Sequence, residues 1–183
     1  DHWGSIFEQQ MHLFFYNKGI GGDIMVPRSG FNQYQSIFNR FYSQILTMNP
    51  LPKYCIFDGG GNDLGAGPSV SHDQILNCFK QIVHDCRIRG IVPIIFVAPC
   101  GPNDSIGFNL ANTQNYMASN ANIKNYCQQD NVLCIDLYQT ELYNPTSFIN
   151  SQFFAPDCIH FNVAGNRVVA DYITNFFKTR NLK

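Results

Sequence analysis

The chain has few charged residues and no long apolar run, and these absences exclude several classes of protein. Charged residues make up 14% of the 183 residues, below the roughly 25% that is usual for soluble domains. The formal net charge is −1, so nothing favours nucleic acid or an anionic membrane as a partner. No apolar stretch approaches the roughly 18–20 residues that a transmembrane helix needs. We therefore expect a globular protein without nucleic-acid partners and without a transmembrane segment.

The seven cysteines form no CxxC pair, which argues against a zinc site and against a redox motif. Cys127 and Cys134 are the nearest plausible disulfide couple, but buried free thiols fit the composition equally well. The cysteines therefore leave the cellular compartment undecided. Hydrophobic residues make up 45% of the chain, and this length can enclose one core. We expect residues 1–183 to form a single domain.

Strand-like and helix-like segments alternate along the chain. Strands are expected at residues 13–17, 53–58, 91–99 and 132–138, and helices at residues 34–46, 72–89, 111–128 and from 163 onward. This alternation predicts an α/β fold in which helices cover both faces of a parallel sheet, as in flavodoxin-like or Rossmann-like proteins. The length and β-branching of residues 91–99 favour a central strand. Ligand groups of such sheets gather on loops at the carboxyl ends of the strands, here residues 18–23, 58–67, 98–107 and 155–161.

Three of these loops carry unusual groupings of glycine, amide, carboxylate and imidazole groups. "NKGIGGD" (17–23) places glycines after a strand, and "GGGND" (59–63) places Asn62 at a strand tip. "APDCIHFNVAG" (155–165) places Asp157 and His160 three residues apart, just ahead of the last helix. Glycine lets the backbone approach a ligand closely, and an amide donates hydrogen bonds that cannot be lost by titration. A histidine beside a carboxylate is suited to general-base work.

In this order, the three loops resemble blocks II, III and V of the SGNH/GDSL hydrolase family. Gly22 resembles the block II glycine, Asn62 the asparagine of the block III GxND motif, and Asp157 with His160 the block V DxxH pair. The resemblance spans about residues 3–178. It implies a flavodoxin-like three-layer sandwich of SGNH type, with a central parallel sheet and helices on both faces.

The resemblance also implies a function. It indicates a serine esterase that forms an acyl-enzyme with a small ester, such as an O-acetylated carbohydrate or an acyl lipid. Gly22 and Asn62 would hold the oxyanion, His160 would be the base, and Asp157 would orient it. No cofactor and no metal are implied. Two rival interpretations stay open: a catalytically inactive module of the same fold that binds a glycan or a partner, and a flavodoxin-like domain whose glycine turns bind a phosphate.

The chain departs from the family at its nucleophile. The family carries a GDS motif at the end of the first strand, and this sequence has none. Ser5 is the sole serine before Gly22, and we reject it because only four residues precede it. It also lies 17 residues before Gly22, whereas a turn, a helix and a strand need about 20–27. We expect the sequence to begin downstream of the nucleophile, with the family's first strand missing as well.

Simpler structural interpretations remain for several of these residues. Asn62-Asp63 is also compatible with an Asx-type turn, His160 with a structural histidine, and the glycines at 19–22 with a plain tight turn. "CGPND" (100–104) repeats an Asn-Asp pair and is interpreted as a surface turn that could still line a pocket. His72 and His84 are expected to be structural or exposed. Asp63, Asp157 and His160 match no known metal-ligand spacing.

Overall fold

The computed structural model describes residues 2–28, 36–65, 70–106 and 108–182. The chain forms two compact units, each assembled from separate stretches of sequence. Unit 1 comprises Asp1–Asn17, Ala98–Leu110 and Ile135–Lys183, and unit 2 comprises Lys18–Val97 and Ala111–Cys134. The start of the helix expected at 34–46 lies outside the described residues.

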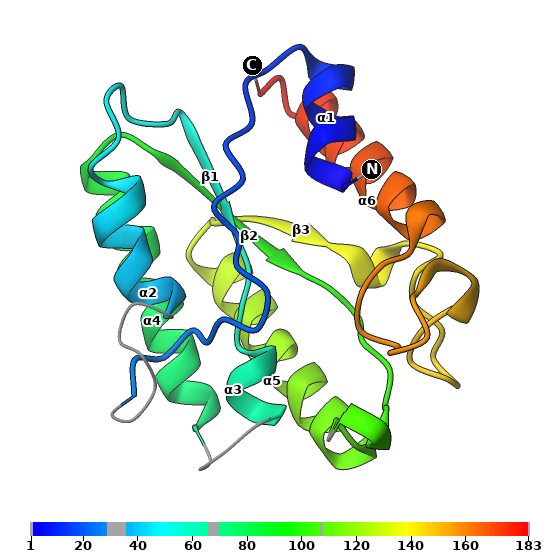
Figure 1. Cartoon of the computed structure of the whole chain (residues 1–183). Helices are drawn as coiled ribbons and strands as arrows, with labels where there is room; N and C mark the ends of the chain where they lie inside the picture. Colours follow the sequence, from blue (N-terminus) through cyan, green and yellow to red (C-terminus); the bar gives the residue numbers. More distant parts are fainter. Residues whose placement is uncertain (1, 29–35, 66–69, 107, 183) are drawn as a thin grey trace. The chain divides into compact units, whose positions relative to one another are not determined.

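The sheet has three strands in the order β1-β2-β3 (Figure 1). β1 (Tyr54–Phe57) and β2 (Val92–Val97) pair in parallel, from Tyr54 opposite Val92 to Phe57 opposite Ile95. β3 (Leu133–Asp136) begins in unit 2. The strands expected at 53–58, 91–99 and 132–138 and the central place of the second are thus confirmed, as is the α/β class. β2 is central because its β-branched, almost wholly buried residues need cover on both faces.

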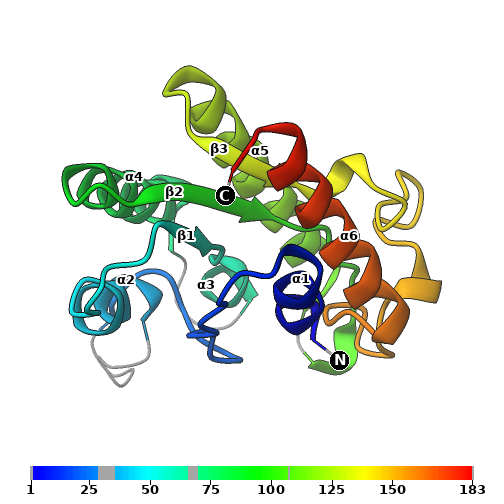
Figure 2. The same ribbon diagram turned by 90° about the horizontal axis from the view of Figure 1, so that it is seen from above.

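Helices of unit 2 lie on both faces of this sheet (Figure 2). α4 (His72–Ile88) and α5 (Leu110–Gln129) lie on one face, and α2 (Ile37–Arg40), which continues as a π-helical turn over Phe41–Ile45, lies on the other. α4 begins with a reciprocal capping box between Ser71 and Gln74. Its buried Phe79 stacks on Phe57 of β1, with ring centroids 5.6 Å apart. The apolar spacing in the sequence predicted these helices correctly.

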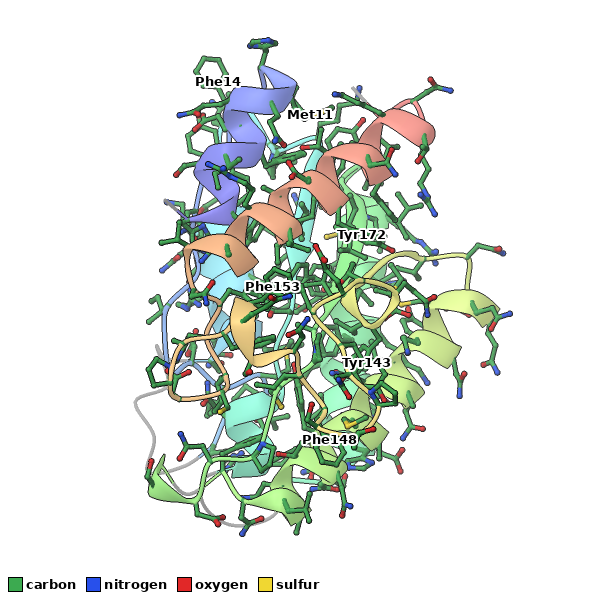
Figure 3. The ribbon with its side chains drawn as sticks, turned by 90° about the vertical axis from the view of Figure 1, so that its right-hand side faces the viewer. Met11, Phe14, Tyr143, Phe148, Phe153 and Tyr172 are labelled. Atoms are coloured by element: carbon green, nitrogen blue, oxygen red, sulfur yellow. The ribbon has the colours of Figure 1, made fainter. Side chains whose placement is uncertain are left out.

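Unit 1 is built around a pair of helices from distant parts of the chain. α1 (Trp3–Met11) lies along α6 (Val163–Thr179), as Figure 3 shows, and the Phe7 and Phe177 rings meet edge to face at 5.0 Å. α6 begins where the sequence predicted it, with Asn162 as its N-cap. No helix in the described part of the chain combines the length and the apolar character needed to cross a membrane.

The strand predicted at residues 13–17 is wrong. This stretch forms no strand, and the side chains of Phe14 and Tyr16 are 91% and 65% exposed. Leu13 is half-buried, and Phe15 packs against the rings of Trp3 and Phe7 in α1. Its backbone N–H donates to Oε1 of Glu8 at 3.1 Å. A run of apolar residues suggested a strand, but here the backbone of Phe15 bonds to a helix side chain, and Phe14 and Tyr16 are exposed.

Candidate active site

Gly22 lies in an exposed turn of unit 2 that a glycine can adopt without strain. Its φ is +79°, in the left-handed region that L side chains rarely enter. A Cβ placed there would meet no atom within 4 Å. The requirement for glycine is therefore conformational rather than steric, and the backbone at this turn is open to an approaching ligand.

The side chain of Asn62 is hydrogen-bonded to Asp23, the residue that follows Gly22. Asn62 lies in the short helix α3 (Gly61–Gly65), which the chain enters through Gly60 at φ +93°. The Nδ2 of Asn62 donates to the carbonyl oxygen of Asp23 at 2.9 Å. An amide carries two N–H groups, so this bond fixes the side chain and leaves a second donor for a ligand. The structure thus brings the predicted residues Gly22 and Asn62 together within unit 2.

Asp157 and His160 form a hydrogen-bonded pair in unit 1. The carboxylate Oδ2 lies 2.6 Å from Nδ1 of His160, and Oδ1 accepts the backbone N–H groups of Ile159 and His160, both at 2.9 Å. Because Nδ1 faces a carboxylate, the network assigns the proton to Nδ1 and leaves Nε2 as the basic nitrogen. The His160 side chain is 73% exposed, so this nitrogen is accessible.

The hydrogen bonds from Ile159 and His160 also lower the pKa of Asp157. Partial burial by itself raises the pKa of this carboxyl, but the hydrogen bonds from the His160 ring and from the two backbone N–H groups outweigh it. The pKa of Asp157 therefore lies below its usual range. At neutral pH the carboxylate is ionised and can stabilise an imidazolium beside it.

The loop that carries this pair is held by backbone bonds on both sides. The N–H of Ala155 donates to the carbonyl of His160 at 2.7 Å, and Phe154 bridges Phe161. At Gly165, in the first turn of α6, a Cβ would lie 2.1 Å from the carbonyl oxygen of Phe153. Only glycine allows this close approach, so the glycine of "NVAG" packs the helix start against the loop.

Asn166 links this loop to the start of the chain. Its Oδ1 accepts the N–H of Trp3, the first residue of α1, at 3.0 Å. Its Nδ2 donates to the carbonyl of Phe161 at 3.1 Å. One amide therefore joins the residue after His160 to the N-terminal helix.

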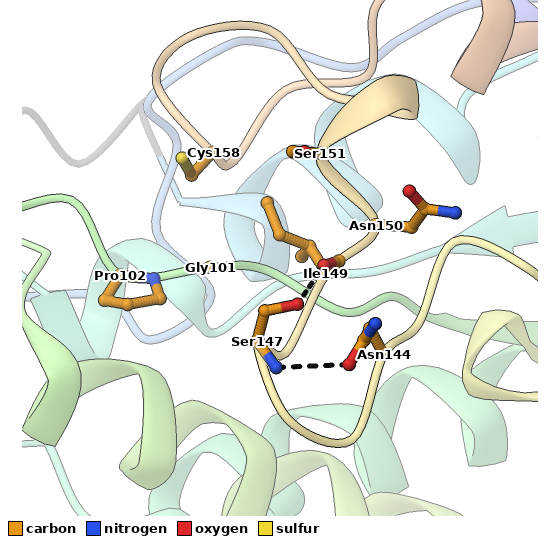
Figure 4. Close-up of a pocket in the computed structure, with 8 residues that line it drawn as sticks. All are labelled: Gly101, Pro102, Asn144, Ser147, Ile149, Asn150, Ser151 and Cys158. Atoms are coloured by element: carbon orange, nitrogen blue, oxygen red, sulfur yellow. Dashed lines mark hydrogen bonds between the residues drawn. The ribbon is translucent and has the colours of Figure 1, made fainter.

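A cavity of about 360 Å³ lies beside the same loop (Figure 4). Its lining is Gly101, Pro102, Asn144, Ser147, Ile149, Asn150, Ser151 and Cys158, none of which is charged. Part of its polar lining is already bonded internally, since Oγ of Ser147 donates to the carbonyl of Ile149 at 2.7 Å. The cavity is thus a neutral, hydroxyl- and amide-lined space next to Asp157 in the chain.

The segment 100–104, interpreted from sequence as a surface turn, supports the Asp157 loop. The N–H of Gly101 donates to the carbonyl of Cys158 at 2.8 Å, and Nδ2 of Asn103 reaches the carbonyl of Pro156 at 3.4 Å. Its Gly101 and Pro102 also line the cavity, as the sequence analysis allowed. Within unit 1, the segment 100–104 therefore supports the loop of the predicted base.

The other sequence candidates lie elsewhere. Ser5 is exposed within α1. His72 opens α4 and bonds through Nε2 to Oδ1 of Asn115 at 2.7 Å, and His84 is exposed within α4. Over the described ranges, no group of three His, Cys, Asp or Glu residues is placed to hold a metal. None of the seven cysteines, all of which the structure describes, forms a disulfide, Cys127 and Cys134 included.

A model of the GDSL-like lipase/acylhydrolase family matches residues 1–168. The chain belongs to this family. The matched region includes stretches of both units, together with all four residues on which the predicted resemblance rests. Membership makes this an ester-hydrolase fold and confirms the resemblance seen in the sequence.

Solved GDSL-type structures share the fold at low sequence identity. A GDSL-like lipase from Bacteroides thetaiotaomicron is 17% identical with a TM-score of 0.78, over 97% of this chain and 82% of its own. An aryl esterase from M. smegmatis is 15% identical with a TM-score of 0.78, over 100% and 86%. A lipase/acylhydrolase from Enterococcus faecalis is 16% identical with a TM-score of 0.72, over 97% and 85%. A search of curated proteins finds no match.

Sequence reasoning missed the residues that anchor the glycine turn at 19–22. Asp63, which the sequence offered only as part of a turn or a metal set, is 1% exposed and bonds to the segment after Gly22. Asp23 and Arg40 form a buried ion pair beside the same turn. Nothing in the sequence indicated that these two carboxylates are buried. Their burial depends on partners that lie 17 and 38 positions away in the chain.

Proposed function

We propose that this protein is a serine esterase that hydrolyses small esters through an acyl-enzyme. Gly22 and Asn62 hold the oxyanion, His160 is the general base, and Asp157 orients it. The nucleophile is a serine outside residues 1–183, on the N-terminal side of Asp1. The observation that carries the proposal is the exposed His160 ring, whose Nδ1 lies 2.6 Å from a carboxylate of lowered pKa while Nε2 is accessible.

The chemistry follows from these roles. Nε2 of His160 takes the proton of the serine hydroxyl as the serine oxygen attacks the ester carbonyl. The carbonyl oxygen becomes an oxyanion, which accepts hydrogen bonds from the Gly22 N–H and the Asn62 amide. Collapse breaks the ester bond, and the imidazolium gives its proton to the leaving alcohol. Water then attacks the acyl-serine by the same route, releasing the carboxylic acid and restoring the serine.

The substrate class is a small neutral ester, either an O-acetylated carbohydrate or an acyl lipid. Family membership supports an ester as the substrate, and the fold is shared with proteins described as an aryl esterase and a lipase. The uncharged lining of the cavity beside the Asp157 loop also fits a neutral ester better than an ionised one. No cofactor or metal has a part in this mechanism.

A second function, non-catalytic binding of a glycan or partner protein, is favoured by one observation. No GDS motif occurs in the sequence, and a domain of this fold without a serine nucleophile would bind its ligand but not cleave it. The two functions differ in what a covalent serine reagent does.

The test is labelling of the complete gene product with a fluorophosphonate, followed by mass spectrometry of the labelled peptide. We expect one labelled serine outside residues 1–183, with labelling strongly slowed in His160→Ala because the base is gone. Ser5→Ala is the control, and it should label like the wild type. Absence of labelling in folded protein would favour the binding module, and labelling at Ser5 would overturn the proposed nucleophile.

A further inference from the structure

Asp63 is a buried carboxylate that follows directly on Asn62 in α3. Its Oδ2 accepts the backbone N–H of Met25 at 2.6 Å, and its Oδ1 accepts the N–H of Val26 at 3.0 Å. These two consecutive N–H groups belong to the segment that leaves the Gly22 turn. Hydrogen bonds to an ionised acceptor are roughly twice as strong as neutral ones, so the side chain at 63 holds this segment firmly.

Arg28 also links the segment after Gly22 to Asp63. Its Nη2 donates to the backbone carbonyl of Asp63 at 2.9 Å and lies 3.3 Å from Oδ1. The two side chains are 10% and 0% exposed, so the guanidinium compensates a charge that would otherwise be buried at high cost. With the Asn62–Asp23 bond, hydrogen bonds run in both directions between residues 23–28 and residues 62–63.

Arg40 fixes the other side of the same turn. Its Nε donates to Oδ2 of Asp23 at 2.7 Å, and its Nη1 donates to the carbonyl of Lys18 at 2.5 Å. Lys18 and Asp23 flank the glycine turn at 19–22, so one guanidinium spans both ends of it. The turn is thereby held at its base, while Gly22 itself remains exposed.

We infer that Asp63 is the positioning residue of the oxyanion hole: it sets the Asn62 amide and the Gly22 turn at a fixed separation without touching substrate. This inference rests on the proposed function. Oxyanion donors act only when they lie about 2.7–3.1 Å from the developing charge. A displacement of about 1 Å can lower the rate on the order of 10²-fold. Asp63 is the one residue that is both the chain neighbour of Asn62 and an acceptor for two backbone groups of the Gly22 segment.

The test is Asp63→Asn in the complete gene product, assayed with p-nitrophenyl acetate. The amide keeps the shape but places an NH₂ against a backbone N–H and removes the charge that Arg28 compensates. We expect kcat to fall about 10–100-fold while KM stays within about threefold, because ground-state binding does not use the oxyanion hole. Asp136→Asn is the matched control, since that carboxylate also accepts a backbone N–H, from Tyr138 at 3.1 Å. Its kcat should be unchanged.

A double-mutant cycle separates this inference from the proposed function. Asn62→Ala alone should lower kcat by about 10²–10³. Because Asp63 acts partly through Asn62, the double variant should lose less than the product of the two single losses. Strictly multiplicative losses, or a normal kcat in Asp63→Asn, would overturn the role of Asp63 while leaving the esterase intact. A normal kcat in Asn62→Ala would instead overturn the oxyanion hole of the proposed function.

If Asp63→Asn does not fold, the variant Arg28→Gln is used to test the inference instead. This variant leaves the carboxylate bonds to Met25 and Val26 in place, and removes the compensating charge together with the guanidinium bond to the Asp63 carbonyl. We expect kcat to fall several-fold at constant KM, with circular dichroism confirming the fold. An unchanged kcat in folded Arg28→Gln would count against the inference.

Discussion

Two carboxylate side chains in this molecule each bond to a nitrogen-bearing side chain, in opposite surroundings. Asp157 and His160 are 31% and 73% exposed, whereas Asp23 and Arg40 are 2% and 9% exposed. An exposed pair is screened by water and typically contributes about 0–1 kcal/mol to folding. A buried pair that loses one partner leaves an uncompensated charge, which costs several kcal/mol. The comparison indicates that the first pair is free to exchange protons and that the second maintains structure.

The variant with the largest expected effect breaks the exposed pair. His160→Ala should lower kcat by on the order of 10⁴–10⁶, as loss of a triad base does. Because the side chain is 73% exposed, the free energy of unfolding should change by no more than about 0.5 kcal/mol. Steady-state kinetics and urea unfolding of the complete gene product measure the two quantities.

His84→Ala serves as the control for this variant, since His84 is an exposed histidine within α4. It should leave kcat unchanged. Activity of His160→Ala within tenfold of the wild type would remove His160 from the mechanism.

Breaking the buried pair should give the reverse pattern. Within the described residues, Oδ1 of Asp23 has no hydrogen-bond partner, so its carboxylate depends on Arg40 through Oδ2. Arg40→Met should therefore lower the free energy of unfolding by about 3–5 kcal/mol, measured by urea denaturation. The double variant Asp23→Asn/Arg40→Met should recover part of this loss, because the stranded charge is gone. Equal stability of Arg40→Met and wild type would mean that the pair is not buried in solution.

The smallest effect concerns pH. The pKa of Asp157 is below its usual range in the folded chain, so the folded state binds fewer protons at this group than the unfolded chain does. Its contribution to stability is then present above the ordinary carboxyl pKa of about 3.9 and is lost as pH falls through the folded value. In His160→Ala the pKa should move upward. A ¹³C NMR titration of the Asp157 carboxyl measures both, and identical midpoints in the two proteins would contradict the pairing.

The part of the site that sequence predicts well is the part made by local contacts. Asp157 accepts hydrogen bonds from residues two and three positions later in the chain. The three-residue spacing from His160 is therefore enough to predict that the two side chains meet. The helix after Ser71 is a similar case, since its capping box lies within four residues. Such features need no knowledge of the rest of the fold.

Contacts between distant segments are the part that sequence reasoning could not supply. Asp63 meets Met25 across 38 positions, and nothing in "GGGND" distinguishes a buried carboxylate from a turn residue. The segment 13–17 shows the opposite error: its apolar residues suggested a buried strand, yet Phe14 is exposed. Whether a side chain is buried depends on which distant segment packs against it, and a single sequence does not show which segments pack together.

The amide of Asn166 has a consequence for biosynthesis. It joins the loop that carries His160 to Trp3, which lies 163 positions earlier in the sequence. A nascent chain cannot form the bond between Trp3 and Asn166 until α6 has emerged from the ribosome. The loop that carries His160 therefore reaches its attachment to α1 only after both helices have been synthesised.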